Sequence, residues 1–263
     1  HSPARHGDRY SLPPIAERKG AGGPFLGPEN RFPGKLNSKN ITPHNLGAWT
    51  DGEIVRALIA GVTREGEPIF PIMPSKGYGS LDREDIYAAV AYLRTLAPVA
   101  NPVPDSEIDF PLNLIMRAAP QDMTYGKRPD PTDTVAFGRY MDAAAGCADC
   151  HTNSVDGRAV GEPFSGGMEF YFPPIGIIRS ANITPDKKTG IGNWTKEAFV
   201  DRFKSMDLET VMNMKVKPGE ANTIMAWWEF AGMKREDLGA IYDFLMTFEP
   251  VFSAVVTFEP IGE

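Results

Sequence analysis

The sequence predicts an all-α fold with two tandem copies of one small helical domain, joined by a proline-rich strap. The chain has 263 residues, which is enough for two ordinary domains. Short motifs recur in the same order in both halves, and stretches with apolar residues at helical spacing follow them. With 24 prolines and 26 glycines, the chain also predicts short helices separated by long ordered loops.

The repeat rests on matched segments. The matching pairs are residues 40–43 and 182–185 (both Asn-Ile-Thr-Pro), 49–50 and 194–195 (Trp-Thr), 66–67 and 219–220 (Gly-Glu), 72–73 and 224–225 (Ile-Met), 83–86 and 235–238 (Arg-Glu-Asp-Ile/Leu), and 23–25 and 162–164. Chance does not produce so many matches in one order. The chain therefore holds two copies of one domain.

We place the first domain at residues 1–96 and the second at residues 133–250. The strap, residues 97–132, has prolines at positions 98, 102, 104, 111, 120, 129 and 131. Each proline removes a backbone donor and disfavours helix in the residue before it. The strap also has an apolar run from Phe110 to Met116, so we expect it to pack against a domain rather than hang free. Residues 251–263 form a C-terminal tail.

Both cysteines of the chain lie in the run Cys-Ala-Asp-Cys-His, formed by Cys147, Cys150 and His151. This is the spacing of covalent c-type haem attachment. Each thiol can add across one haem vinyl group, and the histidine then supplies the proximal ligand of the iron. A redox dithiol does not need the histidine, and a zinc site needs further soft ligands that a chain with two cysteines lacks. The motif therefore predicts haem c.

A six-coordinate haem carrier also needs a distal ligand, and a methionine thioether raises the reduction potential. The chain has eleven methionines, most of which we expect to fill the core. Met73 and Met225 are the ones that occupy matched positions in the two repeats. We therefore predict Met225 as the ligand of the second haem and Met73 as that of the first. Met233 and Met214 remain alternatives for the second haem.

The register of the repeat places His1 where His151 stands in the second copy. We therefore expect two haems, with His1 as the proximal ligand of the first and its two cysteines upstream of the given sequence. Two alternatives remain open: His6 is the ligand instead, or the first domain has lost its haem.

Trp49 and Trp194 each precede a predicted helix at matched positions. Either indole could donate its N–H group to a haem propionate, or it could be a core aromatic that covers the haem edge. The sequence does not separate these two roles. The pattern Thr50-x-x-Glu53 is a capping box and predicts the start of a helix.

Taken together, these motifs resemble the class I cytochrome c fold, and the layout resembles the di-haem cytochrome c family of bacterial electron-transfer chains. The resemblance runs from residue 20 to 247 and implies the ligand roles already given to Cys147, Cys150, His151 and Met225. Similar domains occur as cytochrome subunits of membrane-linked alcohol and aldehyde dehydrogenases. The chain departs from the pattern because no cysteine pair precedes His1 and Ala226 follows Met225.

These observations predict an electron carrier in the periplasm or another extracytoplasmic space, rather than an enzyme. A cytochrome subunit of a dehydrogenase or other redox complex is the alternative. A di-haem peroxidase is disfavoured because it needs an open coordination position for peroxide, and the matched methionines would occupy that position at both irons. The net charge of −7 argues against nucleic acid and is compatible with a redox partner that has a basic patch. We find no apolar run long enough to span a bilayer.

The tail contains a β-branched and aromatic run from Phe252 to Phe258. Such a run is unstable as a lone strand, so it either folds back on its own domain or pairs with another chain. Because the first repeat has no evident counterpart of this run, we favour a homo- or hetero-oligomer contact through residues 251–263.

Overall fold

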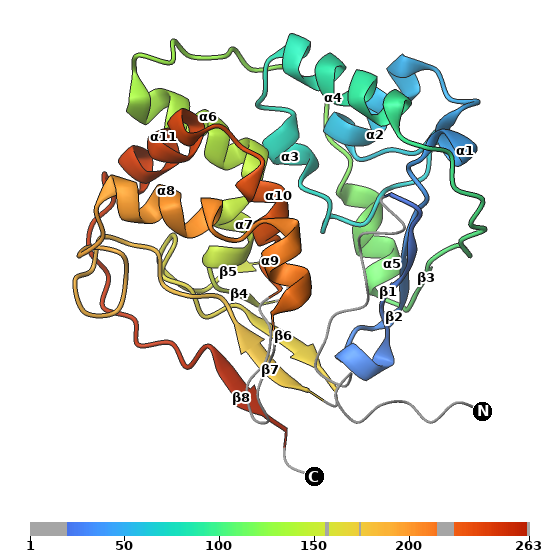
Figure 1. Cartoon of the computed structure of the whole chain (residues 1–263). Coiled ribbons are helices and arrows are strands. Elements are labelled where there is room, and N and C mark those ends of the chain that lie inside the picture. Colours follow the sequence, from blue (N-terminus) through green and yellow to red (C-terminus); the bar gives the residue numbers. More distant parts are fainter. Residues whose placement is uncertain (1–19, 156–157, 174, 215–223, 262–263) are drawn as a thin grey trace. The chain divides into compact units, whose positions relative to one another are not determined.

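The computed structural model describes residues 20–155, 158–173, 175–214 and 224–261 (Figure 1). Two compact units divide the chain between Arg128 and Pro129. Each unit is described by itself below. His1 and His6 lie outside the described residues.

The first unit contains the first repeat and most of the strap. Its elements are β1 (Gly23–Leu26), η2 (Pro28–Asn30), β2 (Gly34–Ser38), α1 (Pro43–Leu46), α2 (Asp51–Ala60), α3 (Ser75–Tyr78), α4 (Arg83–Thr95), β3 (Glu107–Ile108), α5 (Leu112–Ile115) and η3 (Met116–Ala118). Helix α2 begins where the capping box predicted, because Thr50 accepts from the Glu53 amide and Glu53 reaches back to the Thr50 amide.

The second unit contains the second repeat and the tail. Its elements are α6 (Thr134–Ala145), α7 (Cys147–His151), β4 (Ser154–Val155), β5 (Arg158–Ala159), β6 (Glu169–Phe172), β7 (Gly176–Arg179), α8 (Lys196–Lys204), α9 (Leu208–Asn213), α10 (Trp227–Ala231), α11 (Arg235–Leu245) and β8 (Phe258–Pro260). The core is built mainly from α8 and α11, which bury Phe199, Phe203, Leu238, Ile241 and Leu245.

Helices α6 and α11 pack closely against each other in the second unit (Figure 1). The close approach requires Gly138 on α6, because a Cβ atom there would lie 1.9 Å from the backbone oxygen of Ala240 on α11. One helical turn later Asp142 is also buried, with only 7% of its surface exposed. The crossing therefore combines a glycine contact with a buried carboxyl group.

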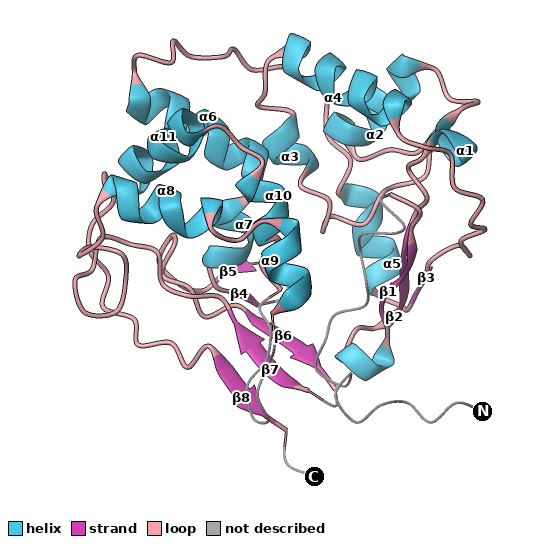
Figure 2. Cartoon of the chain, in the orientation of Figure 1, coloured by secondary structure: helices cyan, strands magenta, loops and turns pink. Residues whose placement is uncertain are grey.

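The all-α prediction is wrong. The described residues contain three antiparallel sheets, β1-β2-β3, β4-β5 and β6-β7-β8, so the fold is mixed α/β (Figure 2). The strands have two to five residues, which is too short for an alternating pattern to stand out. In each three-stranded sheet, the third strand comes from far along the chain, after the last helix of the repeat.

The two three-stranded sheets are copies of each other. Strand β3 from the strap pairs with β2 so that Gly34 faces Ile108 and Lys35 faces Glu107. Strand β8 from the tail pairs with β7 in the same way, with Gly176 facing Pro260 and Ile177 facing Glu259. The tail therefore has a counterpart in the strap, and the expectation that it has none is wrong.

The tail folds back onto its own unit. The Val251 amide donates to Thr184 Oγ1 (3.2 Å), and the Arg179 amide donates to the Thr257 carbonyl (2.8 Å). The Arg179 side chain joins the three strands of the sheet, because it pairs with Glu169 of β6 and Glu259 of β8. This is the first of the two outcomes expected for the tail, although Phe252 and Val256 of the apolar run stay exposed.

The strap contacts the first unit at several points between residues 97 and 128. Asn101 donates to the Ala21 carbonyl (2.9 Å), and Gln121 donates to the Ile59 carbonyl (2.7 Å). At its end, Arg128 pairs with Asp85 at the start of α4. The apolar residues in the strap are only partly covered: Met116 is buried, while Phe110 is 76% exposed.

One matched pair from the sequence is corrected. The Ile183 amide donates to the Phe164 carbonyl (2.9 Å), and the equivalent Ile41 amide donates to the Gly20 carbonyl (2.7 Å). Both acceptor residues have positive φ, 62° and 75°. Phe164 therefore corresponds to Gly20, not to Phe25.

Candidate haem site

The Cys-x-x-Cys-His segment forms its own short helix, α7 (Cys147–His151), directly after α6. Cys147 is half-buried and Cys150 is exposed, and neither is in a disulfide. Cys147 packs against the core cluster of the second unit, which also contacts Met225. The two thiols are thus free to form the thioether bonds of haem c.

The histidine of the motif is oriented by a backbone carbonyl. The Nδ1 atom of His151 lies 2.7 Å from the Ala181 oxygen, and a carbonyl can only accept, so Nδ1 carries the proton. Burial lowers the pKa of His151, which the hydrogen bond partly opposes, so the ring is neutral at physiological pH. The Nε2 atom therefore keeps its lone pair for a metal, the arrangement found around most ligating histidines.

The Asn-Ile-Thr-Pro motif holds that carbonyl in place. Asn182 follows Ala181 and is buried; its Oδ1 accepts from the Thr184 amide (2.9 Å) and hydroxyl (2.8 Å). Its Nδ2 donates to the Val251 carbonyl in the tail (2.8 Å). Gly166 packs directly against Ala181, where a Cβ atom would lie 2.5 Å from the carbonyl carbon. In the sequence this motif marked the repeat, and its role in orienting His151 was missed.

The first unit contains the same scaffold. Asn40 is buried and its Oδ1 accepts from the Thr42 amide (2.9 Å) and hydroxyl (2.7 Å), while its Nδ2 donates to the Val99 carbonyl (2.8 Å). Gly22 packs against Lys39, the residue before the motif, as Gly166 packs against Ala181. The Lys39 carbonyl thus stands where the Ala181 carbonyl stands, and no histidine among the described residues bonds to it.

The two predicted methionines share a backbone turn. The Trp227 amide donates to the Met225 carbonyl (2.8 Å), and the Ser75 amide donates to the Met73 carbonyl (2.8 Å). Each turn leads into a short helix, α10 or α3. Both side chains are half-buried. This equivalence extends the sequence match to the backbone.

Two other methionines were alternatives for the second haem. Met233 also contacts the core cluster that Met225 contacts. Its carbonyl accepts a hydrogen bond from the Lys204 ammonium group, which fixes the backbone of this loop. Met214 is 39% exposed and is not part of that cluster. The structure therefore leaves Met233 as the stronger of the two alternatives.

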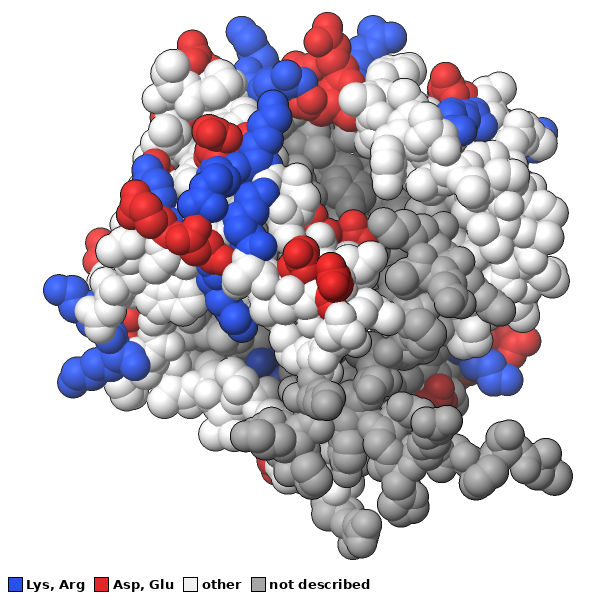
Figure 3. Space-filling model, in the orientation of Figure 1, with Lys and Arg blue, Asp and Glu red and all other residues white. Residues whose placement is uncertain are grey.

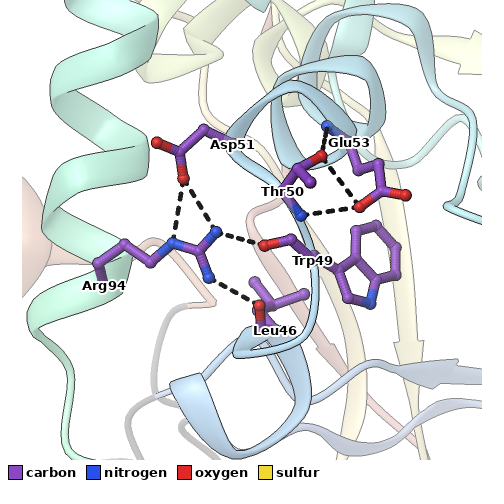
Figure 4. A network of polar contacts seen from close by, with 6 residues as sticks. All are labelled: Leu46, Trp49, Thr50, Asp51, Glu53 and Arg94. Atoms are coloured by element: carbon purple, nitrogen blue, oxygen red, sulfur yellow. Dashed lines mark hydrogen bonds and ion pairs between the residues drawn. The ribbon is translucent and has the colours of Figure 1, made fainter.

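Trp49 and Trp194 occupy loops that are held by α4 in the first unit and by α11 in the second, through different side chains. In the first unit, Arg94 of α4 donates to the carbonyls of Leu46 (2.7 Å) and Trp49 (2.5 Å) and pairs with Asp51 (Figure 4). In the second unit, the Tyr242 hydroxyl of α11 donates to the Trp194 carbonyl (2.6 Å). Trp194 is 39% exposed and lies outside the core cluster.

Two buried polar atoms near the second site lack a partner among the described residues. One is Oδ1 of Asp142, whose carboxyl group also faces the Cys147 thiol. Burial raises the pKa of Asp142 to about 6. The other is the indole nitrogen Nε1 of Trp227. The sequence did not reveal either group. Asp142 lies in an ordinary helical pattern, and Trp227 aligns with Ser75 in the other repeat, so no matched tryptophan drew attention to it.

The comparisons with known proteins agree with this site. The chain is 26% identical over 240 residues to the cytochrome c subunit of a quinone-dependent alcohol dehydrogenase from Gluconacetobacter polyoxogenes, which covers 83% of the chain and 49% of the relative. It is 29% identical over 185 residues to the cytochrome subunit of a fructose dehydrogenase from Gluconobacter japonicus, covering 65% of the chain and 37% of the relative.

The chain is a relative of bacterial cytochrome c subunits. A di-haem cytochrome c from Cereibacter sphaeroides is a further relative, 28% identical over 162 residues, with 56% of the chain and 52% of the relative covered. No protein-family model matches the chain. The resemblance to di-haem cytochromes and dehydrogenase subunits is thereby confirmed, and these relatives support the prediction of a cytochrome c that transfers electrons.

The chain spans about half or less of the length of these relatives. Among its described helices, none is both long and apolar enough to cross a membrane.

Proposed function

We propose that this chain is the electron-transferring part of a cytochrome c subunit that serves a bacterial dehydrogenase complex. The orientation of His151 carries the proposal: its Nδ1 is bound to the Ala181 carbonyl, and its Nε2 is left for iron, directly after two free cysteines. When bound, haem supplies the one-electron Fe(III)/Fe(II) couple. The chain supplies the thioether attachments, the ligands and a buried setting.

The proposed ligand set of this second haem is His151 and Met225, with Cys147 and Cys150 as the attachment residues. The test uses the natural holoprotein and its Met225→Ala variant. Loss of the thioether should lower the reduction potential of one haem and remove its near-infrared sulfur-to-iron absorption band. Met214→Ala is the matched control and should leave both unchanged. A band that survives in Met225→Ala and disappears in Met233→Ala would assign the ligand to Met233 instead.

The first unit is proposed to hold a second haem, with His1 as proximal and Met73 as distal ligand. The support is the matching scaffold of Asn40, Thr42 and Val99 around the Lys39 carbonyl. A carbonyl held in this way is ready to accept the Nδ1 proton of a ligating histidine. Pyridine haemochrome quantitation with mass spectrometry of the natural protein should find two haems in these units. Attachment of haem at Cys147 and Cys150 alone would overturn this part of the proposal.

The proposed site of action is the periplasm or an equivalent compartment, where c-type haem is attached, and the proposed partner is a redox protein with a basic docking surface. The net charge of −7 supports electrostatic docking. Figure 3 shows basic and acidic side chains interspersed on the face in view. The docking surface is therefore expected to be a small acidic patch rather than a whole face of one charge. Rates of electron transfer from a purified dehydrogenase to this protein should fall as salt rises. Rates that do not change with salt would exclude charge-guided docking.

A further inference from the structure

Trp227 contains the one indole N–H group that is buried and has no acceptor among the described residues. A buried donor of this kind costs roughly 1–3 kcal/mol when it stays unpaired. Native proteins rarely carry such a group without a partner that completes it. An indole nitrogen is a donor only, so the missing partner must be a hydrogen-bond acceptor.

The position of Trp227 restricts what that acceptor can be. It lies two residues after Met225, and its amide bonds to the Met225 carbonyl (2.8 Å), so indole and proposed ligand belong to one tight turn. The ring and Met225 both pack against the core cluster that Cys147 contacts. Haem is the group proposed to bind here, and its hydrogen-bond acceptors are its two propionate carboxylates.

The ring is also held firmly. The ring centroid of Phe203 lies 5.1 Å from that of Trp227, and the guanidinium carbon of Arg202 lies 4.8 Å from the indole centroid. A ring fixed between an aromatic and a cation has little freedom to turn its N–H group elsewhere. The Arg202 guanidinium also adds positive potential close to the indole ring.

We infer that Trp227, rather than the matched Trp194, donates a hydrogen bond to a propionate of the haem bound at Cys147, Cys150 and His151. The inference rests on the proposed haem site and goes beyond it. Ser75 occupies the position of Trp227 in the equivalent turn of the first unit, so an indole donor at this position belongs to the second site alone. A donor to the propionate offsets its negative charge, which otherwise favours ferric iron, and so raises the potential of the second haem.

The test is Trp227→Phe in the natural holoprotein, with Trp228→Phe as the matched control. The Trp228 indole already donates to Glu229 (2.9 Å), so its removal should change nothing at the haem. Trp227→Phe should lower the potential of one haem and shift a propionate bending band in the resonance Raman spectrum. The iron ligand bands should stay in place. The inference is overturned if neither readout moves, or if Trp194→Phe produces both effects and Trp227→Phe does not.

A second measurement needs no folded variant. With 15N-labelled tryptophan, each of the four tryptophans of this chain gives one indole N–H signal in the holoprotein. The Trp227 signal should exchange with solvent more slowly than that of Trp228 and should move most between the oxidised and reduced states. Fast exchange of the Trp227 signal, with no shift between the oxidised and reduced states, would exclude the proposed hydrogen bond to the propionate. Loss of haem from Cys147 and Cys150 would instead show that the haem site itself is wrong.

Discussion

Asp142 should destabilise the second unit at neutral pH, and Asp142→Asn should relieve that cost. The carboxyl group is buried in the packing of α6, with Oδ1 unpaired among the described residues, and burial raises its pKa from 3.8 to about 6. Each pH unit of difference between the folded and unfolded pKa is worth about 1.4 kcal/mol. Ionising Asp142 in the folded chain therefore costs about 3 kcal/mol once the pH is above 6.

The sign follows from the direction of the pKa change. Below pH 4 the carboxyl is protonated in both the folded and the unfolded chain, so it costs nothing. Between pH 4 and 6 the unfolded chain loses the proton first, and the stability of the folded chain falls. An asparagine amide at this position cannot be ionised, so the advantage of Asp142→Asn should grow over this interval and stay constant above it.

Hydrogen exchange of the α6 peptide in the holoprotein measures this locally. Comparing variant and wild type at the same pH cancels the intrinsic exchange rate. Protection in Asp142→Asn should exceed the wild type roughly a hundredfold more at pH 7 than at pH 4, in line with the factor of 10 per 1.4 kcal/mol. Glu197→Gln, at an exposed position of α8, is the control. The reasoning is refuted if the difference between Asp142→Asn and wild type does not change with pH.

Three further substitutions test the fold. Gly138→Ala should cost at least about 3 kcal/mol, because its Cβ atom would meet the Ala240 oxygen, and thermal unfolding should show a clearly lower midpoint; an unchanged midpoint would contradict this close contact. Lys234→Asp should stabilise α11 by about 1 kcal/mol, because Lys234 makes no side-chain cap whereas Asp82 caps α4; equal urea midpoints would refute the capping argument. Asn182→Ala should cost about 1–3 kcal/mol by calorimetry, because the buried Thr184 and Val251 groups lose their partner; a smaller loss than for an exposed asparagine would show that water replaces it.

The candidate haem site was predictable from the sequence, because covalent attachment fixes the spacing of Cys147, Cys150 and His151. Matched positions singled out Met225 in the same way. The start of α2 followed from Thr50 and Glu53, whose capping box depends on neighbours in the chain. These features are local or covalent, and local patterns record them directly.

The sheets and the buried polar groups were not predictable from local pattern. Lys35 and Glu107 are opposite each other in the β2–β3 pairing, although they are far apart in the sequence. Because β3 has only two residues, the neighbouring sequence does not indicate a strand at either position. The carbonyl that orients His151 belongs to Ala181, whose side chain has no role in the contact. Asp142 resembles a solvent-facing helical residue until the approach of α11 at Gly138 is known.

The segments that follow α4 and α11 determine where a unit can be cut from the chain and still keep its proposed haem site. Val251 anchors the loop that presents the carbonyl bound by His151, and Val99 anchors the equivalent loop of the first unit; these two residues lie beyond α11 and α4. A second unit excised at the end of α11 would therefore keep every proposed haem ligand and lose the clamp behind one of them. Engineers who graft such a unit onto an enzyme should make the cut after β8, because the segment after α11 holds the loop that orients His151.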